Sequence, residues 1–146
     1  IQEAEDTRTF VLVPREENGQ LAYFAAGQYL SLTLKIGGET VTRPYSLFSS
    51  PRQALQEEYR LTIKRNGSGF VSRYLVDHWQ AGTEVESSAP LGTFTYEPLR
   101  DAKNVVGIAG GSGITPFHSL AQAIADGDED FTLTLLYGTE TMRTRC

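Results

Sequence analysis

The stretch of sequence that decides the fold runs from Tyr29 to Ile36 and reads YLSLTLKI. Its aliphatic residues fall on every second position, so one side of the extended chain is apolar while the other carries serine, threonine and lysine. This alternation predicts a β-strand with one buried face. Gly37-Gly38 follows directly, and glycine reaches the positive φ angles that a tight hairpin turn requires. The stretch therefore predicts an antiparallel sheet.

Short apolar runs separated by turn residues surround this strand. Residues 10–13 and 21–24 flank Asn18-Gly19, a turn signal, and residues 59–64 form a further strand-like run. Two more strand-like runs follow at 83–87 and 93–96. From these signals we expect an antiparallel barrel of about six strands, closed or nearly closed.

One helix interrupts the series of strands. Val71, Leu75 and Trp79 recur at a spacing of four residues, which draws a single apolar stripe along a helix over 71–79. We expect this helix to cover one end of the barrel. Pro98 to Asn104 is polar and has no periodicity, so a domain boundary is placed there, with the first domain over 1–100 and the second over 101–146.

The second domain has a different pattern. Residues 105–109 are an apolar run typical of a strand buried on both faces, and the glycine-rich run 110–113 follows it. Thr115 is expected to cap a helix with Pro116 at its first position, and residues 131–137 form a second apolar strand. The order of strand, glycine turn, helix and strand predicts the first β–α–β unit of a parallel sheet. One such unit cannot bury both sheet faces, so we expect a truncated domain to which further units belong.

Composition excludes several classes of protein. The chain has 146 residues, 40% of them hydrophobic and 21% charged, and a net charge of −5 without any long basic run, which argues against nucleic-acid binding. There is no apolar run long enough for a membrane span, and the first residues are acidic, so we expect a cytoplasmic protein. The single cysteine, Cys146, provides no disulfide. His78 and His118 lack companions at metal-ligand spacing, so we expect no metal site.

Three segments can carry chemistry, although each alone also fits a strand end, a helix start or a tight turn. An arginine fork such as that of Arg43 matches a pyrophosphate, the aromatic face of Tyr45 suits a planar ring, and the Ser46 hydroxyl can donate to a ring nitrogen. A helix that starts at 70–72 would direct free N–H groups at the same pyrophosphate. The turn at 111–113 permits close approach of a second dinucleotide, and no lysine follows it as a Walker motif would require.

In this order, and with Pro90-Leu91-Gly92-Thr93-Phe94 between the second and third, the segments resemble the ferredoxin–NADP(+) reductase family over essentially the whole chain. The resemblance implies a mainly β fold. It consists of an antiparallel Greek-key flavin-binding barrel with one helix over 1–100, then a truncated α/β nucleotide-binding domain, the N-terminal β–α–β part of an NAD(P)H-binding domain, over 101–146.

The resemblance also implies a role for each candidate residue. Arg43 would meet the flavin pyrophosphate, Tyr45 would lie against the isoalloxazine or ribityl group, and Ser46 would be the catalytic residue beside the flavin N5. The other cofactor-binding residues would be Ile63 and Lys64 along the cofactor, Gly69, Phe70, Val71 and Ser72 on the pyrophosphate, and Gly111, Ser112, Gly113, Thr115 and Pro116 around the nicotinamide, with Thr115 facing the flavin.

The activity that the resemblance implies is that of an FAD-dependent NAD(P)H oxidoreductase, of which this chain alone would be an incomplete part. Electrons would pass from NAD(P)H through FAD to an iron–sulfur or haem acceptor. Tyr137-Gly138 is followed by Thr139-Glu140, where the family commonly has a serine or asparagine and an arginine, and an acidic residue there weakly favours NADH over NADPH. The alternatives are a flavin-containing electron-transfer subunit that seldom uses pyridine nucleotide, and a non-enzymatic barrel that binds a nucleotide or a protein.

Overall fold

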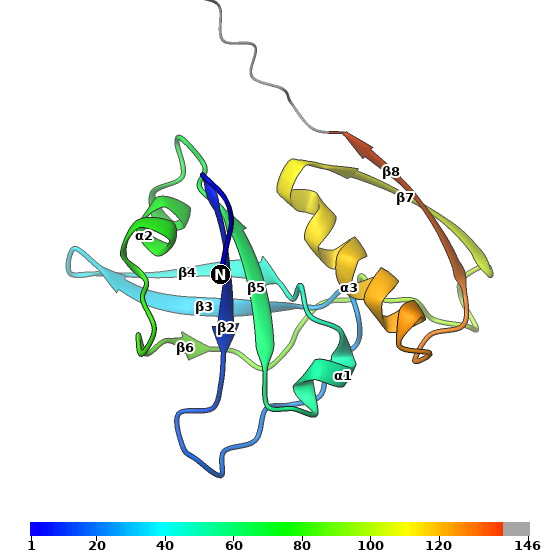
Figure 1. Cartoon of the computed structure of the whole chain (residues 1–146), viewed down its shortest axis with the longest axis horizontal. Coiled ribbons are helices and arrows are strands. Elements are labelled where there is room, and N and C mark those ends of the chain that lie inside the picture. Colours follow the sequence, from blue (N-terminus) through cyan, green and yellow to red (C-terminus); the bar gives the residue numbers. More distant parts are fainter. Residues whose placement is uncertain (139–146) are drawn as a thin grey trace, which may run out of the picture.

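The computed structural model describes residues 1–138 and contains three sheets (Figure 1). The first is antiparallel and has the order β1 (Gln2–Ala4), β2 (Thr7–Leu12), β5 (Tyr59–Lys64). The second is also antiparallel and has the order β4 (Glu39–Ser46), β3 (Tyr29–Ile36), β6 (Glu86–Ser87). The third pairs β7 (Asn104–Gly110) with β8 (Thr132–Gly138). The helices are α1 (Pro51–Ala54), α2 (Phe70–His78), the 3-10 helix η1 (Gly111–Ile114) and α3 (Thr115–Ala125).

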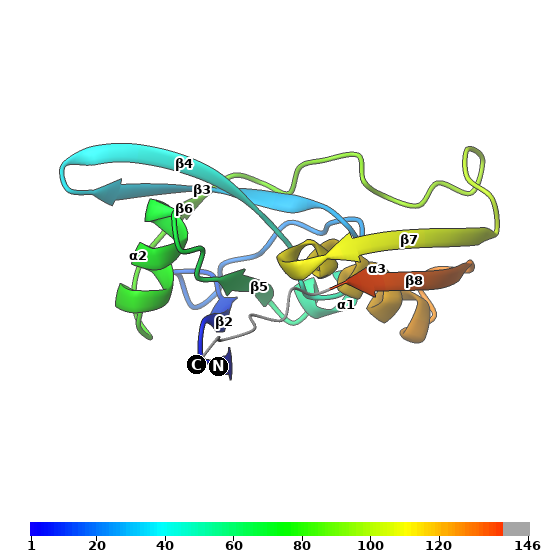
Figure 2. The same ribbon diagram turned by 90° about the horizontal axis from the view of Figure 1, so that it is seen from above.

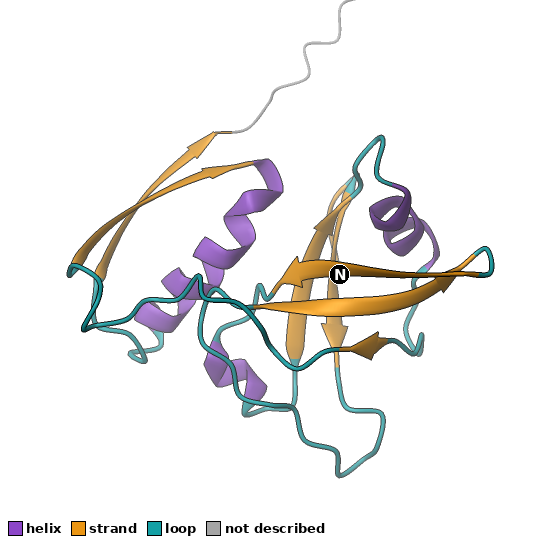
Figure 3. Cartoon of the chain, turned by 180° about the vertical axis from the view of Figure 1, so that it is seen from behind, coloured by secondary structure: helices purple, strands orange, loops and turns teal. Residues whose placement is uncertain are grey.

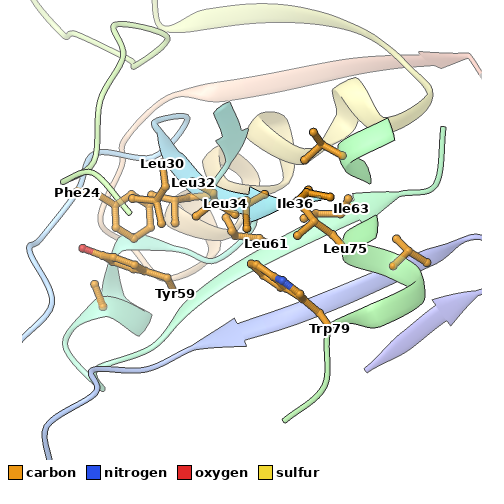
Figure 4. Packing of buried hydrophobic residues seen from close by; sticks show 14 residues of the cluster. Phe24, Leu30, Leu32, Leu34, Ile36, Tyr59, Leu61, Ile63, Leu75 and Trp79 are labelled. Atoms are coloured by element: carbon orange, nitrogen blue, oxygen red, sulfur yellow. The ribbon is translucent and has the colours of Figure 1, made fainter. Parts of the chain in front are cut away.

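The main core lies between the two antiparallel sheets. The four aliphatic residues of β3 that the alternation placed on one face are all buried, which confirms the predicted strand. They face Tyr59, Leu61 and Ile63, the inward residues of β5 (Figure 4). Removing a side chain of this size from water stabilises the fold by roughly 1.5–3 kcal/mol. This core holds β4 and β5 in place.

The predicted helix over 71–79 is confirmed as α2, with bounds shifted by one residue. Val71, Leu75 and Val76 point into the core, and Trp79 follows the last helical turn. The indole packs edge-on against Phe10, with ring centroids 5.1 Å apart. Figures 1 and 2 place α2 at the end of the β3–β4 ribbon that lies away from α3. The helix therefore covers one end of the antiparallel part, as expected.

The barrel is not closed, which corrects the expectation of a closed or nearly closed barrel. No strand of the β1-β2-β5 sheet pairs with a strand of the β4-β3-β6 sheet, and a hollow of about 1040 Å³ lies between β2, β3 and residues 79–87. None of the candidate site residues, all of which the structure describes, lines this hollow. The short helix α1 was also not expected from the sequence.

Two predicted strands are wrong, and a third is short. At 21–24 the backbone binds side chains instead of a strand: the Leu21 N–H donates to Glu57, and the Tyr59 hydroxyl donates to the Ala22 carbonyl. Residues 93–96 are not a strand either, because the aromatic side chains there pack on α3 and Phe131. Of residues 83–87, only Glu86–Ser87 pairs with β3.

The predicted β–α–β unit is confirmed. β7 and β8 are parallel, and α3 lies between this pair and the antiparallel sheets (Figures 1 and 3). Two details are corrected. Only the α3 side of β7 is covered, since Val106 and Ile108 on the other side are 64% and 77% exposed. Thr115 does not cap α3, because η1 continues directly into it; Thr115 is its first residue and Pro116 its second. No helix in the described part of the chain is long and apolar enough to cross a membrane.

Candidate functional site

The candidate site begins where the two antiparallel sheets meet. β4 is an edge strand of one sheet and β5 is an edge strand of the other, and they lie beside each other. Just beyond β4, the Phe48 N–H donates to the Arg60 carbonyl at 2.7 Å, and the Arg60 N–H donates to the Ser49 hydroxyl at 3.1 Å. These bonds join the end of β4 to β5. We call this region the β4–β5 seam.

Three candidate residues lie among the last four residues of β4. Arg43 and Tyr45 are two positions apart, so they share one side of the strand, and Ser46 is the last residue of the strand. Arg43 is exposed and its Nη1 donates to the Thr42 carbonyl at 2.8 Å. Tyr45 and Ser46 are half-buried. Burial raises the pKa of the Tyr45 phenol, against a smaller lowering by the Arg43 charge, so the phenol keeps its proton and can donate.

The two candidates on β5 have side chains that are engaged elsewhere. Ile63 is buried in the main core, so only its backbone can face a ligand. The Lys64 ammonium lies 3.5 Å from the Asp6 carboxylate in an exposed ion pair. Lys64 also offers its backbone more readily than its charge. Ile63 therefore offers a ligand only its backbone, and the charge of Lys64 is shared with Asp6.

A loop over residues 65–69 joins β5 to the start of α2. Gly69 is the N-cap residue, and the Ser72 hydroxyl donates to the Gly69 carbonyl at 3.2 Å while it accepts from the Asn66 N–H at 3.2 Å. Val71 is buried, whereas the Phe70 side chain is 62% exposed. The amides of a first helical turn have no intrahelical acceptor, and they lie at the positive end of the helix dipole. This end of α2 can therefore bind an anion through its backbone.

The space around Gly69 leads to the first prediction. A Cβ atom at this position would lie 2.7 Å from the Ser72 hydroxyl and 3.0 Å from the Asn66 Cβ. We expect Gly69→Ala to displace Ser72, to lower the free energy of unfolding by about 1 kcal/mol and to weaken FAD binding. Urea denaturation and FAD titration measure the two effects. Gly67→Ala is the matched control, because a Cβ there meets nothing within 4 Å; equal effects of the two variants would contradict the prediction.

The glycine-rich turn reaches the same seam from the other side. η1 contacts β5, and Gly111 has a φ of +51°, which favours glycine. Ser112 and Gly113 are exposed. Thr115 is 7% exposed, and its hydroxyl donates to the Ser112 carbonyl at 3.0 Å, so this hydroxyl holds the turn together. Pro116 is half-buried in the first turn of α3.

Sequence reasoning missed four residues that connect the end of β4 to α3, namely Phe48, Ser49, His118 and Ser119. The His118 Nδ1 lies 3.0 Å from the Phe48 carbonyl, and the Ser119 hydroxyl donates to the Ser49 carbonyl at 2.6 Å. The two residues of each pair are 70 positions apart in the chain, and no local sequence pattern marks them. His118 is thus satisfied by protein contacts. Among residues 1–138, no three histidine, cysteine, aspartate or glutamate side chains lie close enough to hold a metal ion. Thr139, Glu140 and Cys146 lie outside the described residues.

Known proteins resemble this chain in sequence and in fold. The family model described as an oxidoreductase FAD-binding domain matches residues 1–96. A glycine betaine monooxygenase reductase subunit from Chromohalobacter salexigens is 33% identical over 143 residues, which are 98% of this chain and 38% of that protein. The chain therefore spans well under half the length of this relative.

Two solved structures are also similar. The flavohem-like FAD/NAD binding domain of nitric oxide dioxygenase from Vibrio cholerae has a TM-score of 0.80 and 30% identity, over 97% of this chain and 60% of that one. A phthalate dioxygenase reductase, described as a modular structure for electron transfer from pyridine nucleotides to a 2Fe–2S group, has a TM-score of 0.78 and 29% identity. That match covers 94% of this chain and 40% of the reductase.

Proposed function

The chain belongs to the oxidoreductase FAD-binding domain family, and on that premise we propose that it is the flavin-binding part of a reductase that carries electrons from NAD(P)H to an iron–sulfur or haem acceptor. The observation that carries the proposal is the β4–β5 seam. On β4 it carries an exposed arginine and a half-buried tyrosine and serine, and β5, the strand beside β4, contacts α2, whose N-terminal end has free amides. These are the groups that a flavin dinucleotide requires: charge and amides for its pyrophosphate, and a planar face for its ring.

We assign the residues of the seam as follows. Arg43 and the amides of the first turn of α2 bind the pyrophosphate, Tyr45 lies against the flavin, and Ser46 donates to N5. The fit is supported by Gly69, where a side chain would fill the space that Ser72 occupies at the anion-binding end of the helix. On β5, Ile63 and Lys64 contribute backbone, in line with the burial of one side chain and the ion pair of the other.

When bound, FAD would supply the redox chemistry, which is the uptake of a hydride from the nicotinamide and the passage of its two electrons to the acceptor, with the proton released. The role of the chain is to hold the cofactor and to direct the nicotinamide. The turn at 111–113, with Thr115 and Pro116, is proposed to hold the nicotinamide. NADH is the proposed donor, on the basis of Glu140, which lies outside the described residues. The acceptor classes are supported by the similar monooxygenase and phthalate dioxygenase reductases.

The test is to incubate the purified chain with FAD, remove free cofactor and record the visible spectrum. We expect bound, oxidised flavin, and we expect anaerobic addition of NADH to bleach it faster than NADPH does. A colourless protein would contradict the proposal and favour a non-enzymatic barrel. Bound flavin that dithionite reduces and neither nucleotide reduces would favour an electron-transfer subunit.

A further inference from the structure

We propose that a joint between β4 and α3 positions the turn at 111–115 against Ser46, and that His118 is its positioning residue. The joint consists of Phe48 and Ser49 on one side and His118 and Ser119 on the other. The inference rests on the proposed function, because it concerns how the nicotinamide reaches the flavin. It assigns a role to residues that lie outside the proposed cofactor contacts.

His118 contacts Phe48 in two ways. A carbonyl oxygen can only accept, so the 3.0 Å contact requires that Nδ1 carries the proton and donates it to the Phe48 carbonyl. The two rings also stack, with centroids 3.7 Å apart and planes inclined by 13°. The hydrogen bond fixes the position of the imidazole along the backbone, and the stack fixes its plane. The His118 side chain therefore constrains both the distance and the orientation of α3 relative to Phe48.

Ser119 makes the joint stiff. Its hydroxyl donates to the Ser49 carbonyl at 2.6 Å, and the two residues are 0% and 1% exposed. A buried hydrogen bond is costly to break, because each group would lose its partner without gaining water. Ser49 also accepts from the Arg60 N–H through its hydroxyl, which ties the joint to β5. The joint is thus continuous with the β4–β5 seam.

Along the chain, the joint is close to both Ser46 and the turn at 111–115. Phe48 is two residues beyond Ser46, and His118 is three residues beyond Thr115, one helical turn away on the same face of α3. At the other end of α3, Arg52 and Asp128 form an ion pair at 2.5 Å, with the arginine side chain 51% exposed. Exposed pairs contribute little. The buried joint, rather than this ion pair, therefore sets the position of the turn.

The first measurement needs no cofactor. Amide hydrogen exchange of the cofactor-free chain should show that His118→Ala accelerates exchange over residues 111–117 by about tenfold, since the turn loses its anchor. His118→Asn should restore slow exchange, because its side-chain amide nitrogen can donate from nearly the same place as Nδ1. His78→Ala is the matched control, because the His78 ring lies against Tyr74 on α2, away from the joint.

The second measurement compares two hydride donors on the FAD-loaded chain. Single-turnover reduction by NADH should be about tenfold slower at saturation in His118→Ala, because a displaced donor loses its near-attack geometry. The FAD dissociation constant should stay within about twofold. Reduction by N-benzyl-dihydronicotinamide, which lacks the nucleotide portion that the turn would hold, should not change. His118→Asn should recover most of the NADH rate.

Several outcomes would overturn the inference. Unchanged exchange over 111–117, an unchanged NADH rate, or an equal loss of rate with both donors would each do so, the last because it would place the damage in the flavin site. Wild-type chain that binds FAD but is not reduced by NADH would also overturn it, while flavin binding would stand. If the wild-type chain does not bind FAD, the proposed function fails instead, and normal exchange in His118→Ala would then reject the joint separately.

Discussion

Gly27→Ala should lower the free energy of unfolding by about 3 kcal/mol, the largest loss of stability that we expect from a single methyl group in this chain. A Cβ atom at this position would lie 1.9 Å from the carbonyl oxygen of Phe94, and the glycine has a φ of +96°. The clash is with backbone, so no rotation of a side chain relieves it. Urea denaturation followed by tryptophan fluorescence measures the change.

The control separates the clash from the backbone angle. Gly82 has a φ of +87°, and a Cβ there would meet nothing within 4 Å. Gly82→Ala should therefore cost only the strain of the left-handed conformation, about 1 kcal/mol. If the two variants lose the same stability, the close approach of residues 27 and 94 does not decide the outcome.

The contact at Gly27 matters to the site because Phe94 also contacts α3. The Phe94 ring meets Phe117 of α3 edge-on at 5.2 Å, and Tyr96 stacks on Phe131 at 4.0 Å. The loop around Phe94 thus packs against α3 with one side and against Gly27 with the other. A shift of this loop moves the same helix that carries His118, so Gly27→Ala should also slow reduction of the flavin by NADH.

Local patterns predicted the elements whose stability is local or whose burial is regular. β3 was predictable because one face is buried along its whole length, and α2 because its apolar stripe is regular. The segment 21–24 was not, because its apolar side chains resemble a strand while its backbone binds Glu57 and Tyr59 from elsewhere in the chain. Closure of the barrel depends on which edges pair, and the alternation within a strand does not specify its neighbour.

The candidate site divides in the same way. Arg43, Tyr45 and Ser46 could be named from sequence because a short motif contains them, and the turn at 111–113 because glycine is required there. The joint could not be named, since Phe48 and His118 are 70 residues apart in the chain and no local pattern links them. Nor does the sequence reveal that Ile63 points into the core and that Lys64 pairs with Asp6. These facts decide which groups remain for a ligand.

Arg43 is the residue whose replacement should have the largest effect on FAD binding. The Arg43 guanidinium is exposed on β4 and donates through Nη1 to the Thr42 carbonyl, so most of its planar fork remains free for a ligand. Replacing it by alanine should remove a bidentate, charge-assisted contact with the pyrophosphate. Such contacts contribute about 1.5–3 kcal/mol, so we expect the FAD dissociation constant to rise by about 10- to 150-fold.

Lys64→Ala provides the matched control for Arg43→Ala, since it removes one positive charge from the neighbouring edge strand. The Lys64 ammonium is already paired with Asp6, and an exposed pair of this kind contributes little, so we expect FAD affinity to change by less than about threefold. Titration of the cofactor-free variants with FAD, followed by flavin fluorescence at two salt concentrations, measures both constants. The Arg43 variant should also show the weaker salt dependence, because it has lost the direct contact between charges. Equal losses of affinity in the two variants would mean that the pyrophosphate is attracted by the general charge of the seam, and Arg43 would then have no specific place in the site.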